Sequence, residues 1–296
     1  MLQDLLGAVT LGSIYLMFAL GMSLAWGSIG ILNFAHGSIF MFAAFVGYLV
    51  LAQSPLSLTA LVALGVTVGA LLSVLVHVVA FEQITRWAKD HRTAEMQILI
   101  GGIGIAGIPL ALAQYETRSN PFGFTQSSFQ PTIHVVGDLR VSDLQVLIVV
   151  AAAVLTTAIA LWLRHSRQGL ALRSIGVDAE VASMMGVNRR RFAIATMAVA
   201  GGLAGLAAVL YTFYVGALTP ESGETLIIKA FACIILGGVG STAGVAVGAF
   251  ALAFAETLVL TNFGGLWGDA ISFSLIFAVL LLRPAGLFGK KAVRRT

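Results

Sequence analysis

The chain has 296 residues, of which 58% are hydrophobic and only 10% are charged, and its mean hydropathy is +0.97. A soluble domain carries roughly 25% charged residues, whereas here apolar runs of about 20 residues, the length that crosses a bilayer, recur from end to end. This composition excludes a soluble globular domain and predicts an all-α, polytopic integral membrane protein. The single cysteine, Cys233, excludes an intrachain disulfide.

Nine apolar runs predict membrane spans within a single transmembrane domain over residues 1–296. In chain order the runs are 5–26, 30–51, 57–81, 95–115, 143–163, 192–215, 226–240, 243–260 and 269–283. Eight or ten crossings fit as well if "GILNFAHG" or "LGGVGSTAG" is a re-entrant segment. We therefore expect about eight to ten transmembrane helices, some of them broken or re-entrant.

The second run, 30–51, begins with a polar group, because Asn33, His36 and Gly37 lie within five positions. A polar group in hydrocarbon is costly unless it faces the interior of the helix bundle or a cavity. The group is therefore a loop between helices, a metal or catalytic site, or a break in a helix beside a solute path. The other histidines are far away in the sequence, so no partner at metal-ligand spacing supports the second interpretation.

A second interrupted segment, Leu236–Glu256 ("LGGVGSTAGVAVGAFALAFAE"), is a rough counterpart of Asn33–Gly47 ("NFAHGSIFMFAAFVG"). Each begins with glycine and polar residues and continues as a helix rich in small residues. Glycine-interrupted segments at matching places in two halves indicate a solute site built from broken helices. Ordinary helix ends at the membrane edge explain the pattern equally well.

Three further polar residues lie in or beside apolar runs. Lys229 is close to a polar segment, so we expect its amine to reach the outer interface by snorkelling. Glu256 is also expected near an interface. His77 lies close to the end of its span, where we expect local groups to satisfy it.

The basic residues predict the orientation of the chain. Of the 17 Lys and Arg, 14 lie in three segments, Arg86–Arg92, Arg164–Arg191 and Arg283–Arg295. Such segments remain in the cytoplasm. The amino terminus is then outside and the carboxyl terminus is cytoplasmic, and the polar segment 116–142 is the main extracytoplasmic loop.

The cytoplasmic loop 164–191 has its own helical pattern. Its apolar and small residues recur at steps of three or four, which predicts one or two short helices, with Asp178 opening the second and Gly186 ending it. An amphipathic helix lying on lipid and a plain connector are alternatives. Only a docking site for a partner makes use of a compact, structured loop.

The glycine patterns favour packing over nucleotide chemistry. A "GxGxxG" match at Gly102, Gly104 and Gly107 lacks the preceding strand that a dinucleotide site needs, and no P-loop or HExxH motif occurs. We therefore expect no catalytic residue, no metal site and no cofactor on this chain, which is not predicted to be an enzyme. Glycines four apart predict close helix packing; the pairs are Gly65/Gly69 and Gly201/Gly205.

Four blocks of sequence in order resemble the LivH-type permeases of branched-chain amino acid ABC importers of the bacterial inner membrane. They are "NFAHGSIFMFAAFVGYLV", "SRQGLALRSIGVDAEVASMMGVNRRRFAIATMAVAGGLAGLAAVL", "KAFACIILGGVGSTAGVAVGAFALAFAE" and "LLLRPAGLFG". The resemblance favours the broken-helix interpretation, in which Gly37 allows close packing while Asn33 and His36 satisfy freed backbone groups. On this interpretation the translocation path is lined by Asn33, Phe34, His36, Gly37, Gly237, Gly238, Gly240 and Ser241.

The resemblance also implies partners. They are a second, LivM-like permease, two ATP-binding subunits that hold the ATP and Mg²⁺, an extracytoplasmic solute-binding protein and the lipid bilayer, with no nucleic acid. The segment Asp178–Gly186 matches the coupling segment of such permeases, although Asp178-Ala179-Glu180 replaces the usual Glu-Ala-Ala and no Leu-Pro follows Gly186. The coupling residues are then Gly169, Arg173, Asp178, Ala179, Ala182 and Gly186.

The leading hypothesis is a permease subunit that imports branched-chain or other small apolar amino acids. Related machinery that imports urea or short amides is the nearest alternative. A self-sufficient secondary transporter or channel would leave the structured loop 164–191 unexplained. An intramembrane enzyme would need a set of catalytic residues, and the sequence shows none.

Overall fold

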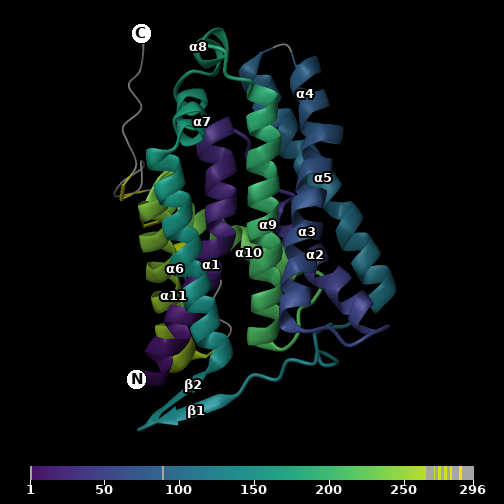
Figure 1. The fold of residues 1–296 in the computed structure, drawn as a ribbon, viewed down its shortest axis with the longest axis vertical. Coiled ribbons are helices and arrows are strands. Elements are labelled where there is room, and N and C mark those ends of the chain that lie inside the picture. Colours follow the sequence, from purple (N-terminus) through teal and green to yellow (C-terminus); the bar gives the residue numbers. More distant parts are fainter. Residues whose placement is uncertain are drawn as a thin grey trace.

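A computed structural model describes residues 2–88 and 90–264, together with isolated positions between 270 and 288. The described chain is a bundle of helices with one small β-hairpin at an end of the bundle (Figure 1). The elements are α1 (Leu2–Ile29), α2 (His36–Leu51), α3 (Leu58–Val76), η1 (His77–Phe81), α4 (Glu82–Trp87), α5 (His91–Thr117), β1 (Ile133–Val136), β2 (Leu139–Ser142), α6 (Asp143–His165), α7 (Arg167–Val177), α8 (Ala179–Met184), α9 (Arg189–Val215), α10 (Ser222–Gly237) and α11 (Thr242–Phe263).

Six helical segments are long and apolar enough to cross a membrane. They are Leu2–Gly27, Leu58–Trp87, Thr93–Thr117, Asp143–His165, Arg189–Val215 and Thr242–Asn262. The second of these joins α3, η1 and α4 into one continuous segment of 30 residues. These segments confirm the predicted all-α, polytopic membrane protein.

Two predicted spans are shorter than a crossing. The runs 30–51 and 226–240 correspond to α2 and α10, which have 16 residues each. At about 1.5 Å per residue such a helix is roughly 24 Å long, less than the ~30 Å of the hydrocarbon core. Neither helix crosses the bilayer alone, which corrects the prediction that each run is a full span. The ninth predicted span, 269–283, falls outside the continuously described residues.

Close contact between α3 and α9 forms one side of the bundle. A Cβ atom added at Gly205 would overlap the Gly65 carbonyl, and one added at Gly69 would overlap the Gly201 carbonyl. The two helix backbones therefore touch, as the glycine spacing predicts. Helix α9 also packs against α1 and α2, so it stands near the centre of the bundle in Figure 1.

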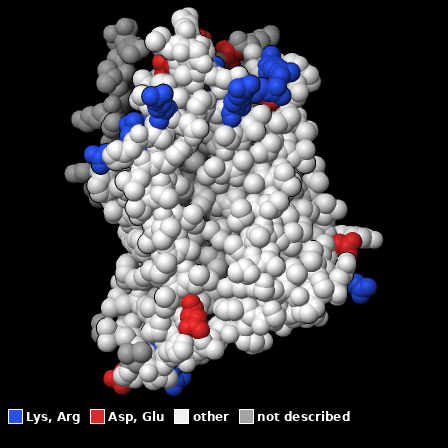
Figure 2. Space-filling model, viewed as in Figure 1, with Lys and Arg blue, Asp and Glu red and all other residues white. Residues whose placement is uncertain are grey.

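The two ends of the bundle differ in structure and charge. One end holds α4, α7 and α8, and Figure 2 shows Lys and Arg gathered there, above a broad uncharged band on the face in view. We call it the basic end. At the opposite end lies the antiparallel hairpin β1–β2. The hairpin occupies part of the predicted loop 116–142, and an isolated bridge between Phe122 and Leu218 ties that segment to the α9–α10 connection.

Candidate translocation site and coupling segment

The connection between α1 and α2 folds back into the bundle. Gly30 has a φ of 71°, which favours glycine, and α2 begins six residues later at His36. The His36 ring stacks on Phe18 at 4.7 Å between centroids, and its Nε2 donates to the Phe18 carbonyl oxygen at 3.2 Å. Because Phe18 lies near the middle of α1, α2 starts about halfway along α1. The geometry favours a broken helix over a loop at the membrane edge.

The polar residues of the break are buried and bond mainly to nearby backbone. Asn33 is only 2% exposed, and its Oδ1 accepts a hydrogen bond from the Ala35 amide at 2.9 Å. The Asn33 carbonyl accepts a bond from the His36 amide at 3.2 Å. These bonds satisfy backbone groups that the break frees, as predicted. The Asn33 Nδ2 has no hydrogen-bond partner among the described residues.

The first turns of α2 and α10 pack against each other. A Cβ atom at Gly37 would overlap the Gly223 carbonyl, and one at Gly223 would overlap the Gly37 carbonyl. Gly37 also lies beside Ile227, and Gly223 lies beside Met41, so the two helices run antiparallel there. The close packing predicted for Gly37 is confirmed. The sequence did not indicate which segment Gly37 packs against, and the structure shows that it is the start of α10.

A cavity of about 210 Å³ opens where α2, α5 and α10 meet. We call it the junction cavity. Its walls are mainly apolar, with one hydroxyl and one carboxylate. It is lined by Phe34, Gly37, Ser38, Ile103, Ala106, Gly107, Leu110, Gly223, Glu224 and Ile227.

A larger, polar cavity of about 540 Å³ lies at the basic end. Gly30 and Ile31 line it, together with residues of η1, α4, α5, α7, α8 and α9. The chain thus passes from this cavity at Ile31 to the junction cavity at Phe34. Phe34 packs beside Gly102 of α5, and its ring lies 5.1 Å from that of Phe231 on α10. Asn33 therefore lies, along the chain, between residues that line the two cavities.

Gly237 is the last residue of α10, and Gly238, Gly240 and Ser241 belong to the turn between α10 and α11. Gly238 and Gly240 have φ values of 97° and 77°, and the Ser241 hydroxyl caps α11 by accepting from the Gly244 amide at 3.1 Å. Gly240 lies against Gly27, near the end of α1. None of the four lines either of the two cavities, and their place in a translocation path stays a prediction.

A buried polar triad, which the sequence pattern missed, joins α1, α10 and α11. Lys229 Nζ lies 2.5 Å from Glu256 Oε1 and donates to the Tyr15 hydroxyl at 3.0 Å, while that hydroxyl donates to Glu256 Oε2 at 2.8 Å. Lys229 and Glu256 are 7% and 5% exposed. The prediction that they reach an interface is wrong, because each is the other's counter-ion inside the bundle. Two opposite charges in separate apolar runs were the available signal.

The predicted cytoplasmic loop 164–191 has the two short helices that the sequence predicts, α7 and α8. Asp178 accepts from the Glu180 and Val181 amides at 3.1 and 3.0 Å, which caps α8. Gly186, which ends the turn after α8, has a φ of 86°. Ala182 is buried, so α8 packs inward on that side.

The turn from α6 into α7 is tight. A side chain at Gly169 would overlap the carbonyls of Trp162 and Leu163. The Arg173 guanidinium donates to the Gly169 and Arg164 carbonyls at 3.4 and 3.5 Å. Of the predicted coupling residues, Gly169 and Arg173 therefore hold α7 against α6, whereas Asp178, Ala179, Ala182 and Gly186 shape α8.

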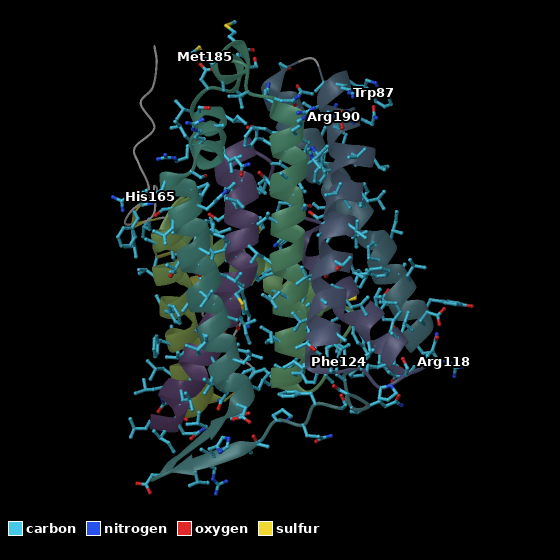
Figure 3. All side chains as sticks on the ribbon, in the orientation of Figure 1. Trp87, Arg118, Phe124, His165, Met185 and Arg190 are labelled. Carbon is cyan, nitrogen blue, oxygen red and sulfur yellow. The ribbon has the colours of Figure 1, made fainter. Side chains whose placement is uncertain are left out.

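The outer side of α8 is apolar and exposed. Met184 at its end and Met185 just after it are 82% and 80% exposed, and Val181 of α8 and Val177 of α7 are also exposed. Figure 3 shows Met185 at the tip of the basic end. Flexible methionines at an exposed site are typical of protein-binding surfaces.

An ion pair links the start of α9 to α4. Arg190, in the first turn of α9, places Nε 2.9 Å from Glu82 Oε1, and Arg86 of α4 lies 2.6 Å from the same oxygen. His77, one turn before Glu82, is buried with no partner for its Nδ1 among the described residues. The prediction that local groups satisfy His77 is therefore wrong for that nitrogen.

Comparison with known proteins gives a consistent set of matches. The model of a family described as branched-chain amino acid transport system / permease component matches residues 5–280. The chain is 29% identical over 310 residues to the high-affinity branched-chain amino acid transport system permease protein LivH of Escherichia coli K12, covering 99% of this chain and 97% of that protein.

Two other relatives also match nearly end to end. The chain is 28% identical over 306 residues to the permease protein BraD of Pseudomonas aeruginosa, covering 99% of this chain and 97% of that protein. It is 27% identical over 302 residues to a probable branched-chain amino acid transport permease protein LivH of Methanocaldococcus jannaschii, covering 96% and 91%.

Proposed function

The chain belongs to the family of branched-chain amino acid transport system permease components, and from that membership we propose that it is the membrane-spanning permease subunit of an ATP-driven, binding-protein-dependent importer. Its solutes are branched-chain or other small apolar amino acids. The family match over residues 5–280 carries the proposal. The apolar walls of the junction cavity favour such solutes over urea or short amides.

The same machine needs other subunits. A second, LivM-like permease completes the path, an extracytoplasmic binding protein delivers the solute, and two ATP-binding subunits supply ATP and Mg²⁺. The exposed apolar side of α8 supports a docking role for Asp178–Gly186 on an ATP-binding subunit. Because α7 and α8 are short, capped helices, they can transmit a displacement of the docked ATP-binding subunit, which a flexible connector would absorb.

The protein lies in the cytoplasmic membrane of a bacterium, with its basic end in the cytoplasm. The gathering of Lys and Arg at α4, α7 and α8 supports that orientation. The start of α1 lies at the opposite end of the bundle, which supports an extracytoplasmic amino terminus. The predicted cytoplasmic carboxyl terminus lies outside the residues that the structure describes.

Reconstitution tests the proposal. The chain is co-expressed with its neighbouring transporter subunits, purified in mild detergent and placed in proteoliposomes with the binding protein. We expect a second permease and ATP-binding subunits to co-purify, and labelled leucine to enter only with ATP and Mg²⁺. Uptake of urea without leucine would overturn the solute class, and uptake by this chain alone without ATP would overturn the importer.

A further inference from the structure

We propose that the junction cavity is a solute subsite on the permease itself, shaped for a zwitterionic amino acid with an apolar side chain. This inference rests on the proposed function and deepens it. In this subsite the first turn of α2 with Ser38 holds the solute carboxylate, and Glu224 holds its ammonium group. Ile103, Leu110 and Ile227 contact the apolar side chain.

The carboxylate position has two kinds of donor. The first amides of a helix lack partners within the helix and carry its positive partial charge. Ala35, which precedes α2, supplies no side-chain cap. The His36 amide bonds to the Asn33 carbonyl, whereas the Gly37 and Ser38 amides make no hydrogen bond among the described residues. Ser38 is only 7% exposed and lines the cavity, and its hydroxyl makes no hydrogen bond among the described residues. The hydroxyl is thus available to a ligand in the cavity, to which it can donate a hydrogen bond.

The ammonium position is the Glu224 carboxylate. It is the one acidic group in the cavity wall, and the described residues give it no ion pair. The neighbouring acid Glu221 differs, because Gln114 donates to its carboxylate at 2.7 Å and it does not line the cavity. A positive group in the cavity would therefore bind at Glu224 and not at Glu221.

The size of the cavity depends on glycine. Gly107 of α5 lines it, and a Cβ atom there would meet nothing within 4 Å. A longer side chain at Gly107 would thus enter the space that a solute side chain needs. Gly104 also has nothing within 4 Å of an added Cβ, but it does not line the cavity. The two glycines provide a matched pair.

Direct binding to the assembled importer in nanodiscs, without the binding protein, tests the polar positions. Labelled leucine is competed with 4-methylpentanoate, which lacks the ammonium group, and with 3-methylbutylamine, which lacks the carboxylate. We expect Glu224→Gln to weaken leucine about tenfold and leave 4-methylpentanoate unchanged, since a charge-assisted hydrogen bond is lost. Ser38→Ala should weaken leucine and 4-methylpentanoate but not the amine. The control Glu221→Gln should bind leucine like the wild type.

A second arm tests the apolar position. Gly107→Leu should weaken leucine about tenfold while alanine competes as before, because only the larger side chain is excluded. Gly104→Leu should change neither the binding of leucine nor the competition by alanine. Co-purified ATP-binding subunits report the assembly of each variant, and if Ser38→Ala fails to assemble, the exposed positions Glu224 and Gly107 decide.

The outcomes separate the subsite from the proposed function. Equal leucine binding by wild type, Glu224→Gln and Gly107→Leu, or no binding to the wild-type complex with or without ATP, would overturn the subsite. Leucine uptake driven by ATP would in that case still support the importer. If the importer carries urea and not leucine, the proposed function itself fails.

Discussion

A charged pair inside a membrane protein is stable only while both partners are present. Lys229 and Glu256 are buried near the middle of α1, where Tyr15 completes their hydrogen bonds. Removing one member of a buried pair costs about 3–5 kcal/mol, because the other charge stays buried without a counter-ion. Replacing both by apolar groups avoids that cost. The triad therefore fixes α10 between α1 and α11.

We predict that Lys229→Met or Glu256→Leu alone strongly lowers the thermal stability of the detergent-solubilised complex, whereas the double variant restores most of it. Tyr15→Phe should cost less, about 1–3 kcal/mol, since it leaves the ion pair intact. The measurement is the melting temperature by fluorescence-detected size exclusion. If the decreases in melting temperature of the two single variants add up in the double variant, Lys229 and Glu256 do not act as a stabilising ion pair.

At the scale of elements, the backbone contact between α3 and α9 leaves no room for a methyl group. We predict that Gly205→Ala lowers the melting temperature of the complex, because the new Cβ atom would overlap the Gly65 carbonyl. Gly202→Ala is the control on the same helix, since its Cβ would meet Val66 at an ordinary 3.5 Å. Equal melting temperatures for the two variants would show that the contact is looser than described.

The break between α1 and α2 supports a different prediction, because Phe34 lines the junction cavity three residues after Ile31, which lines the cavity at the basic end. Phe34→Ala should leave the complex assembled but allow labelled leucine to cross proteoliposomes without ATP, since the variant removes the ring that packs beside Phe231 and lines the junction cavity. Phe42→Ala, which lines neither cavity, is the control. If leucine does not cross proteoliposomes that carry Phe34→Ala without ATP, the barrier to leucine lies elsewhere in the protein.

The long helices could be predicted from the sequence because a membrane span is recognised by its length and apolar content alone. The short ones could not be bounded, because an apolar run continues across a break that tertiary contacts decide. Thus 30–51 looks like one span, although Gly30 turns the chain and α2 starts only at His36.

Part of the site could not be predicted from the sequence, because it depends on contacts between residues that are far apart along the chain. The contact of Gly37 with Gly223 spans most of the chain, and nothing local in either segment indicates its partner. The buried pairing of Lys229 with Glu256 has the same origin, since each charge alone looks like an interfacial residue. The capped coupling helices, by contrast, follow from local signals at Asp178 and Gly186.

For the whole molecule, transport requires that movement at α8 reach the helices around the cavities. The chain provides one direct path, since α8 leads into α9. The Arg190–Glu82 ion pair provides another, from the start of α9 to α4. Arg190 is 61% exposed, and exposed pairs contribute about 0–1 kcal/mol, so this contact matters little for stability. We infer that it makes α9 and α4 move together.

We predict that Arg190→Ala leaves assembly and ATP hydrolysis nearly intact but lowers the number of leucine molecules imported per ATP hydrolysed. Arg86→Ala is the matched control, because it removes the other partner of Glu82 and leaves the link between α9 and α4 in place. Both rates are measured on the same proteoliposomes. If both variants keep the wild-type ratio, coupling runs through the backbone of α9 alone. If Arg86→Ala lowers the ratio as much as Arg190→Ala does, the charge of Glu82 matters and the link between the helices does not.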